Sequence, residues 1–501
     1  MTDDAPYNAG EAGVSFAARR GSDVVLRCAR ETVTGAALAA SSYAVQAELA
    51  RRGLARGDRV LLQLRDSPAF FAVFLGALRG GFVPVPVSTL LPERDLAFIA
   101  RDCGAEALAC DDDARAPESL FGSGRVLRAR DGAAFAGVAS GAEPAPVPTR
   151  AGDDAFWLYT SGTTGEPKGV PHRHVDPLVA VERFGRGVLG LGSRDRVLSA
   201  AKLHFAYGLG NSLFFPLWLD AEVCLLAERA TPEAVFARLV RDAPTVFFGV
   251  PTLYAALLAH PDPPAALPSL RICVSAGEAL PAALAERWRE RFGAEVLDGL
   301  GSTEMLHVFI ANRPGEARPG SSGKPVPGYD VRLVDADGRD VADGEIGALL
   351  ARGDSAARRY HARPEETART MFAPGWLHTG DSYRRDADGF YWHCGRSDDL
   401  MKVSGLYVSP VEVEAALAAH PAVAEVAVVG RSDADGLTKP HAFVVAARGA
   451  EPGAALAREL QELVKAKCAP HKYPREVHFV SELPKTATGK IRRHLLREPA
   501  P

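Results

Sequence analysis

Hydrophobic and polar positions along roughly the first 320 residues predict a mixed α/β architecture. Short β-prone runs, such as "AEALACDD" (105–112) and "LRICVSAGE" (270–278), alternate with helical patterns. Residues 231–242 open with Thr-Pro-Glu, which is a helix-start signal. Residues 42–80 show helical segments around the strand-like run "GDRVLLQL". Because strands and helices alternate, we expect parallel sheets covered by helices.

From about residue 320 the pattern changes to turns and short strands. The stretches 335–353 and 384–396 contain Asp-Gly turns, which predict a smaller β-rich module. Further on, a helix entered at Ser409-Pro410 and followed by a strand indicates a separate α+β domain in the last hundred residues. A chain of 501 residues also exceeds one ordinary core, so we expect two or more domains.

Composition and charge exclude several classes of protein. With 47% hydrophobic and 24% charged residues, the chain is not expected to be disordered throughout. A net charge of -4 offers no basic field, so nucleic acid is not an expected partner. The 7 cysteines stand singly, which argues against a disulfide framework. Without a signal peptide or an apolar run of about 20 residues, we expect a cytoplasmic protein that does not bind membranes.

The segment 159–169, "YTSGTTGEPKG", has the chemistry of a nucleotide-phosphate loop. Its glycines let backbone amides approach an anion, its hydroxyls donate to phosphate oxygens, and Lys168 adds a positive charge. It follows the apolar run "FWLYT" and therefore emerges from a strand. It is not a Walker loop, because no Gly-Lys-Ser/Thr follows Gly162.

Four further motifs follow in order: "GLGSTE" (299–304), "HTGD" (378–381), "GRSDDLMKVSG" (395–405) and "PKTATGK" (484–490). Together with the loop they resemble the adenylate-forming superfamily of acyl-CoA synthetases, peptide-synthetase adenylation domains and luciferases. The resemblance implies a large N-terminal domain of α/β subdomains plus a β-rich subdomain. It also implies a small, mobile α+β C-terminal domain. The expected boundaries are an N-terminal domain at 1–394, a hinge at 395–398 and a C-terminal lid at 399–501.

The resemblance also implies roles for individual residues. Lys490 is similar to the lysine that bridges the acid and the α-phosphate, and Glu304 to the carboxylate that holds Mg²⁺, an oxygen-preferring ion. Asp381 resembles the acceptor of the ribose hydroxyls, and Arg396 a second contact there. The expected ATP-binding residues are Thr160, Ser161, Gly162, Thr163, Thr164, Gly165, Lys168, Gly277, Glu278, Ala279, Asp298, Gly299, Leu300, Gly301, Thr303, Asp381 and Arg396. Leu300 stands where many members place a tyrosine against adenine.

Three positions match residues of the family that act when the lid rotates between two half-reactions. Asp398 matches the hinge, Lys402 a basic position that faces the active site in the second conformation, and Gly405 the glycine beside the pantetheine tunnel. Tyr207 matches the aromatic gate of that tunnel. The implied cofactors are therefore ATP, Mg²⁺ and coenzyme A, and the alternative thiol acceptor is an acyl carrier protein.

Within the superfamily, segments such as "ICVSAGEALP" and "GLGSTEMLHVFIANR" look most like benzoate-CoA ligases and their hydroxybenzoate and aminobenzoate relatives. The residues expected to line the acid pocket are Ala206, Tyr207, Gly277, Gly301, His307 and Val308. Neither Ala206 nor Tyr207 is acidic, so neither could pair with the α-amino group of an amino-acid substrate. The expected small-molecule partner is therefore an aromatic acid.

Several alternatives stay open at this point. His307 either hydrogen-bonds a ring substituent or packs against the ring, and His204 replaces an expected phenylalanine. His172 and His174 have a His-x-His spacing without a third ligand nearby in sequence, so zinc is not expected there. A silent nucleotide-binding protein is disfavoured because Lys490, Glu304 and Asp381 are all present. We expect a monomer or a homodimer.

Overall fold

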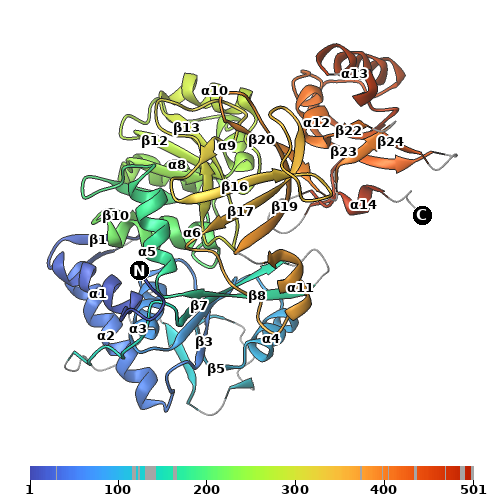
Figure 1. Ribbon diagram of the computed structural model, residues 1–501. Helices are drawn as coiled ribbons and strands as arrows, with labels where there is room; N and C mark the ends of the chain where they lie inside the picture. The colour runs from blue at the N-terminus through green and yellow to red at the C-terminus, as the bar shows by residue number, and fades with distance from the viewer. Residues whose placement is uncertain are drawn as a thin grey trace. The chain divides into compact units, whose positions relative to one another are not determined.

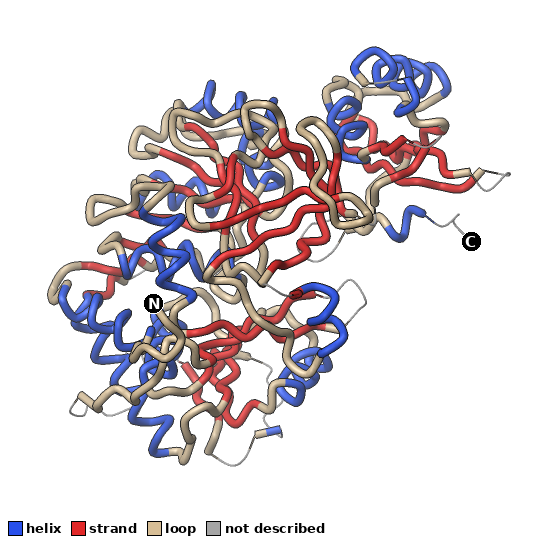
Figure 2. The backbone as a smooth tube through the Cα atoms, viewed as in Figure 1, coloured by secondary structure: helices blue, strands red, loops and turns tan. Residues whose placement is uncertain are grey.

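The computed structural model describes residues 1–29, 31–114, 120–121, 124–129, 143–161, 166–372, 375–397, 399–403, 406–433, 437–468, 470–485 and 491–497. The chain divides into two compact units (Figure 1), with Met1–Asp330 and Ala351–Leu377 in unit 1 and Val331–Leu350 and His378–Pro501 in unit 2. Helices and strands are mixed in both units (Figure 2). The predicted α/β class is therefore confirmed.

A nine-stranded sheet forms the framework of unit 1, in the order β15-β14-β13-β12-β11-β9-β10-β1-β2. The six central strands, β13, β12, β11, β9, β10 and β1, pair in parallel. The outer strands β2, β14 and β15 pair antiparallel with their neighbours. The bounds are β1 Val24–Arg27, β2 Thr32–Thr34, β9 Arg196–Ser199, β10 Glu222–Cys224, β11 Val246–Gly249, β12 Ile272–Ala276, β13 Glu295–Gly301, β14 Val308–Ala311 and β15 Lys324–Pro325. The predicted parallel sheet is thus present, with its loops at the carboxyl ends of the strands available for a site.

Three helices cover part of this sheet: α8 (Pro232–Asp242), α9 (Pro251–Leu258) and α10 (Ala282–Phe292). Each contributes large apolar side chains to one core, in which Trp288 lies 4.9 Å from the ring of Tyr254. The hydroxyl of Thr231 accepts a hydrogen bond from the Ala234 amide and caps α8. The helix expected from the Thr-Pro-Glu signal is therefore confirmed.

A second, four-stranded sheet of unit 1 is entirely parallel, in the order β4-β3-β5-β6. Its bounds are β3 Arg59–Gln63, β4 Val83–Pro86, β5 Ala105–Asp111 and β6 Val126–Ala129. Figure 1 shows α1 (Ala9–Arg19), α2 (Gly35–Arg51) and α3 (Pro68–Arg79) side by side in this part of the chain. The order α2, β3, α3 confirms the helices and strand predicted over 42–80.

Unit 1 contains five further described helices. They are α4 Glu93–Asp102, α5 Asp176–Ala180, α6 Ala206–Leu209, α7 Phe215–Trp218 and α11 Pro364–Thr370, with π-helical turns at Val181–Arg186 and Gly210–Phe214. A long hairpin, β7 (Asp154–Ser161) with β8 (Pro167–Arg173), completes this unit. The division between the units falls within β16 (Tyr329–Val334), β17 (Ile346–Gly353) and β19 (Trp376–Arg385).

Unit 2 contains a three-stranded sheet, β23 (Val423–Ser432), β24 (Thr438–Ala446) and β25 (Glu476–Phe479), with β24 and β25 parallel. One face packs against α12 (Pro410–Ala418) and α13 (Ala454–Lys467). The other face carries Phe443 and packs against α14 (His494–Arg497). Ser409 caps α12 through the Glu412 amide, so the predicted helix entry is confirmed.

Two further features bear on the class of protein. All 7 cysteines are free thiols. Within the described ranges, no helix combines the length and the apolar composition that crossing a membrane would take.

Candidate active site

The expected phosphate loop connects the two strands of the β7–β8 hairpin. Thr160 pairs with Lys168 across the hairpin, and Ser161 pairs with Pro167. Strand pairing therefore fixes both ends of the segment, as the strand-then-loop pattern predicted. The loop residues Gly162, Thr163, Thr164 and Gly165 lie outside the described residues, and of Ser161 only the backbone is described.

Lys168 and Glu304 are linked through Tyr360, a residue that the sequence did not single out. The Lys168 ammonium lies 5.3 Å from the centre of the Tyr360 ring, within range of a cation–π contact. The Tyr360 hydroxyl donates to Glu304 Oε1 over 2.7 Å. A basic loop residue and the expected metal ligand are thereby held next to one another. Tyr360 lies in the irregular stretch before α11, where no periodicity or spacing marks it.

The backbone of the "GLGSTE" segment is also held from two sides. A ring nitrogen of His172 lies 2.8 Å from the carbonyl oxygen of Thr303. The Ala357 amide donates to the carbonyl oxygen of Glu304 over 2.7 Å. His172 also contacts Asp176 at 3.1 Å, whereas His174 accepts a hydrogen bond from the Ala9 amide. The two histidines of the His-x-His sequence thus have separate structural partners.

The segments expected beside adenine are neighbours at the carboxyl ends of β12 and β13. Ser275 is in register with Asp298, and Ala276 with Gly299. The segment Gly277 to Ala279, which follows β12 directly, therefore starts beside the last residues of β13, Asp298 to Gly301. Ligands of open parallel sheets bind at this edge. Gly277 has a φ of 92°, a left-handed conformation that favours glycine. The sheet thus brings together two segments that lie 20 residues apart in sequence.

Asp298 is an unusual member of this group because it is almost fully buried. Its Oδ1 atom has no hydrogen-bond partner among the described residues. Burial raises the pKa of Asp298 well above its usual range, against the opposing effect of the Leu280 and Gly299 amides. A carboxyl with an unused oxygen at a sheet edge is a ready partner for a polar ligand group.

Tyr207 and Gly301, two of the residues expected to line the acid pocket, lie against His307. Tyr207, in α6, lies 5.5 Å from the His307 ring, and Phe215 lies 4.5 Å away in an edge-to-face arrangement. A side chain on Gly301 would lie 2.8 Å from the His307 carbonyl oxygen, so only glycine fits there without a shift. Ala206 and Val308 are both buried. The structure therefore brings these predicted pocket residues together in unit 1.

A buried hydrogen bond sets the orientation of the His307 ring. Its Nε2 lies 3.1 Å from Asn211 Oδ1 and 3.4 Å from the Tyr207 carbonyl oxygen, so Nε2 carries the proton. Nδ1 has no partner among the described residues. Burial lowers the pKa of His307 to about 3, which keeps the ring neutral. Asn211 and Phe215 were missed by the sequence analysis, because a polar residue inside the apolar run "GLGNSLFFPLWL" gives no direction for its side chain.

The two other aromatic positions have their own partners. The Tyr207 hydroxyl donates to the Val274 carbonyl oxygen over 3.3 Å, and its ring lies edge-on to Phe248. The His204 ring lies 4.2 Å from the Phe205 ring at a tilt of 49°, and burial lowers the pKa of His204 to about 4. His204 is therefore a neutral ring beside an exposed phenylalanine.

In unit 2, the expected ribose contacts face each other on paired strands. Asp381 in β19 is in register with Arg396 in β20 (Tyr391–Arg396), and Arg396 Nη1 lies 3.2 Å from Asp381 Oδ1. His393 Nε2 lies 3.7 Å from the same oxygen. Lys402 lies in β21 (Met401–Val403), opposite Tyr407 in β22 (Leu406–Val408), and only its backbone is described. Asp398, Gly405 and Lys490 lie outside the described residues.

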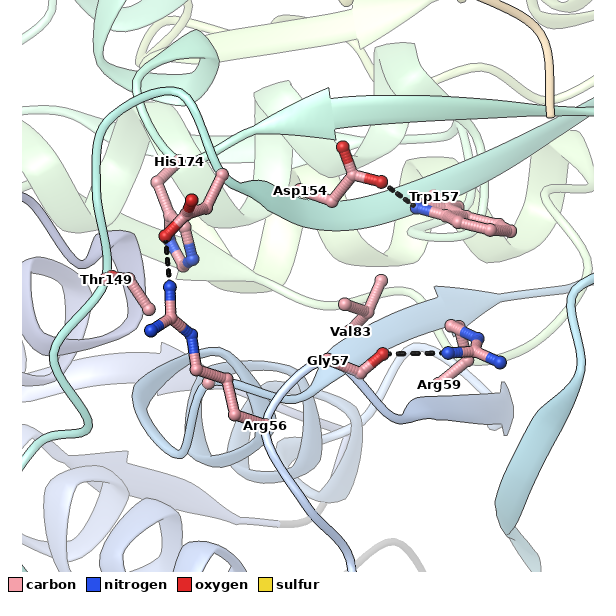
Figure 3. Close-up of a pocket in the computed structure, with 10 residues that line it drawn as sticks. Arg56, Gly57, Arg59, Val83, Thr149, Asp154, Trp157 and His174 are labelled. Carbon is pink, nitrogen blue, oxygen red and sulfur yellow. Dashed lines mark hydrogen bonds and ion pairs between the residues drawn. The ribbon is translucent and has the colours of Figure 1, made fainter. Parts of the chain in front are cut away.

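A cavity of about 370 Å³ opens elsewhere in unit 1, and its lining includes none of the predicted site residues (Figure 3). Its polar groups are paired with one another: Arg56 contacts Asp153 at 2.6 Å, and the Trp157 indole donates to Asp154 over 3.2 Å. Arg59 donates to the Gly57 carbonyl oxygen over 2.9 Å. These internal pairs leave little for a ligand to bind, so we do not assign the active site to this cavity.

Comparison with known proteins places the chain in a family. A family model described as AMP-binding enzyme matches residues 15–361, and a second, AMP-binding enzyme C-terminal domain, matches residues 412–490. The chain therefore belongs to the AMP-binding enzyme family, a family of adenylate-forming enzymes.

Individual relatives are similar over nearly the whole chain. A benzoate–CoA ligase of Thauera aromatica is 49% identical over 458 residues, which are 89% of this chain and 86% of that protein. The crystal structure of a benzoate CoA ligase from Burkholderia xenovorans LB400 has a TM-score of 0.90 at 42% identity and covers 98% of this chain and 100% of that chain. An anthranilate CoA ligase in complex with anthranoyl-AMP has a TM-score of 0.90 at 38% identity and covers 99% and 97%.

Proposed function

We propose that this protein is an AMP-forming aryl-CoA ligase that converts benzoate or a substituted benzoate to its coenzyme A thioester. In the first half-reaction the carboxylate attacks the α-phosphorus of ATP and pyrophosphate leaves. In the second, the thiol of coenzyme A attacks the aroyl-AMP and AMP leaves. The observation that carries the choice of acid is the cluster of aromatic rings around His307, and the similarity to benzoate- and anthranilate-activating relatives supports it.

The residues around His307 would suit a flat ring. Gly301 and Ala206 carry little or no side chain, and Tyr207, Phe215 and neutral His307 would offer ring faces and edges. None of these residues bears a charge that would pair an α-amino group. An unsubstituted ring needs apolar contact alone, whereas a ring hydroxyl or amino group calls for a hydrogen-bond partner. The unpaired Nδ1 of His307 is an acceptor, so hydroxy- and aminobenzoates belong in any substrate screen.

Adenylation requires two anions to approach one another, so charge neutralisation and positioning dominate catalysis. Lys168 and the 160–165 loop would hold phosphate oxygens, and Lys490 would stabilise the charge that develops between the acid and the α-phosphate. Asp381 would accept the ribose hydroxyls while Arg396 holds its carboxylate. Gly277 to Ala279 and Asp298 to Gly301 would form the adenine edge. Thr303 would add a hydroxyl beside the phosphates.

The residues around Glu304 fit a magnesium ion. Mg²⁺ prefers one or two carboxylates together with phosphate oxygens and water. The Tyr360 hydroxyl occupies only Oε1 of Glu304, and this bond orients the carboxylate. When bound, the ion would neutralise phosphate charge, and Glu304 would be the protein's contribution to its ligand shell.

The proposal for coenzyme A rests on domain rotation. We propose an N-terminal domain at 1–394, a hinge at 395–398 pivoting at Asp398, and a lid at 399–501. Rotation would replace Lys490 by Lys402 at the active site, and Tyr207 and Gly405 would border the pantetheine arm. The small-molecule partners would be the acid, ATP and coenzyme A. The protein would work as a monomer or homodimer in the cytoplasm.

The test of the first half-reaction is acid-dependent ATP–pyrophosphate exchange. We would screen benzoate, its hydroxy, amino and halo derivatives, cyclohexene carboxylates and short fatty acids. We expect aromatic acids to support exchange and Lys490→Ala to abolish it, while that variant still forms thioester from supplied aroyl-AMP. A preference for fatty acids would contradict the aryl assignment, and near-normal exchange by Lys490→Ala would contradict the mechanism.

A further inference from the structure

Two histidines and a glutamate converge on the face of the three-stranded sheet in unit 2 that also packs against α14. His441 lies in β24, and Glu476 and His478 lie two residues apart in β25. His441 is in register with Glu476, and Phe443 with His478, so the three side chains project from the same face. This is the face opposite α12 and α13.

The separations of the three donor atoms match the edges of a coordination polyhedron. His441 Nδ1 lies 3.1 Å from His478 Nε2, and Glu476 Oε2 lies 3.4 Å from His478 Nε2 and 3.7 Å from His441 Nδ1. Two ligands of a tetrahedral zinc ion, each about 2.0–2.1 Å from the metal, stand roughly 3.3 Å apart. The two imidazole rings lie nearly coplanar, with these nitrogens facing each other, so both rings would have to turn for one ion to touch all three atoms.

From this geometry we propose that His441, Glu476 and His478 form a binding site for a divalent transition-metal ion such as Zn²⁺. Imidazole nitrogens and a carboxylate oxygen suit this class of ion rather than Mg²⁺ or Ca²⁺. Three protein ligands leave at least one position for water or a small anion. The Glu476 side chain is 62% exposed and that of His441 11% exposed, so solvent can reach the cluster from the Glu476 side.

An aromatic stack supports one of the two imidazole ligands. Phe443 stacks on His478 at 4.7 Å and fixes the plane of that ring. Arg431 lies over the Phe443 ring. The positive charge of Arg431 opposes the binding of a metal cation, and the carboxylate of Glu476 offsets that charge.

The site would join β24 to β25, the strand that leads toward the predicted Lys490 segment. An ion that binds only the folded chain stabilises it by mass action. Without metal, the close nitrogen pair is one hydrogen bond between imidazoles. The metal-bound cluster and the metal-free histidine pair differ in metal content, so a metal-binding measurement distinguishes them. The proposal is independent of the adenylation chemistry.

The experiment uses the full-length, untagged chain, stripped with chelator and titrated with Zn²⁺ by calorimetry and with Co²⁺ by visible absorption. We expect one equivalent of metal and a Co²⁺ spectrum without thiolate charge-transfer bands. His478→Gln and His441→Gln should each weaken binding by more than about tenfold, the least that removing even an outer-shell partner costs. Zn²⁺ should also raise the melting temperature of the parent chain and not that of the variants.

Two further variants keep the result interpretable. Glu476→Gln alters an exposed side chain, so it tests the third ligand without threatening folding. His420→Gln is the matched control, because His420 pairs with Glu459 at 3.1 Å in the same unit, outside the cluster. The control should bind as the parent does. Equal zinc affinity for the parent, Glu476→Gln and His478→Gln, or no binding by the parent, would overturn the proposal.

Discussion

The hydrogen bond between Asn211 and His307 is the most specific structural claim about the acid pocket, and Asn211→Ala perturbs it directly. The substitution removes the Oδ1 atom that lies 3.1 Å from His307 Nε2. Only the weaker 3.4 Å contact with the Tyr207 carbonyl oxygen would then hold the ring among the described residues, because Nδ1 is already unpaired. We expect the imidazole to lose its fixed orientation against the acid.

The size of the effect follows from burial. Asn211 is fully buried and His307 is 3% exposed, so the bond is shielded from water. Leaving one buried partner unsatisfied costs about 1–3 kcal/mol. If that cost falls on the acid-bound transition state, kcat/KM for benzoate drops about 5- to 150-fold. The KM for ATP should stay within about twofold of the parent value, since neither residue belongs to the expected ATP contacts.

A double-mutant cycle gives the decisive comparison. Asn211→Ala, His307→Ala and the double variant would be assayed for benzoate-dependent thioester formation. Because Asn211 acts through His307, the double variant should lose little more than His307→Ala alone, with a coupling energy of about 0.5–3 kcal/mol. Losses that add to within about 0.5 kcal/mol would refute the reasoning.

Three other expectations concern different parts of the molecule. Gly301→Ala places a methyl group 2.8 Å from the His307 carbonyl oxygen, so it should lower kcat/KM for benzoate about 5- to 150-fold, which corresponds to roughly 1–3 kcal/mol of overpacking, while an unchanged value would contradict the close approach. Asp381→Asn should raise the KM for ATP in steady-state assays and leave the KM for benzoate near the parent value; the reverse pattern would contradict a ribose role. Burial lowers the pKa of His174 to about 4 from 6.5, so the unfolded chain binds the extra proton and stability falls as pH drops from 6.5 toward 4, by up to about 1.4 kcal/mol per pH unit for this group. His174→Gln should flatten that acid loss in chemical denaturation, and an identical pH slope would refute the assignment.

The fold was predictable where local patterns and global structure agree. Helix starts at Thr231 and Ser409 carry their own capping chemistry, and alternating strands and helices indicate a parallel sheet. The order of strands was not predictable, because β9 pairs with both β10 and β11 while β1 lies beside β10, which is almost 200 residues later. Such pairings depend on tertiary packing that no local window contains.

The candidate site divides in the same way. Motifs that keep a fixed order, such as the "GLGSTE" segment, predict which backbone segments form the candidate site. Side chains that complete it from other elements were missed: Tyr360 reaches Glu304 from 56 positions away, and Asn211 reaches His307 from 96. The His441, Glu476 and His478 cluster was missed for the same reason, since 35 residues separate its first two members and only the pairing of β24 with β25 joins them.

The central claim is that one enzyme joins an aromatic acid to coenzyme A at the expense of ATP, and the products of a single reaction mixture test it. Purified protein would be incubated with ATP, Mg²⁺, benzoate and either coenzyme A or a phosphopantetheinylated carrier protein, and products resolved by liquid chromatography and mass spectrometry. We predict benzoyl-CoA and AMP in equal amounts, with little acyl transfer to the carrier protein. Benzoyl-AMP that accumulates with coenzyme A but is consumed by carrier protein would contradict the acceptor, and the absence of benzoate-dependent AMP would contradict the account as a whole.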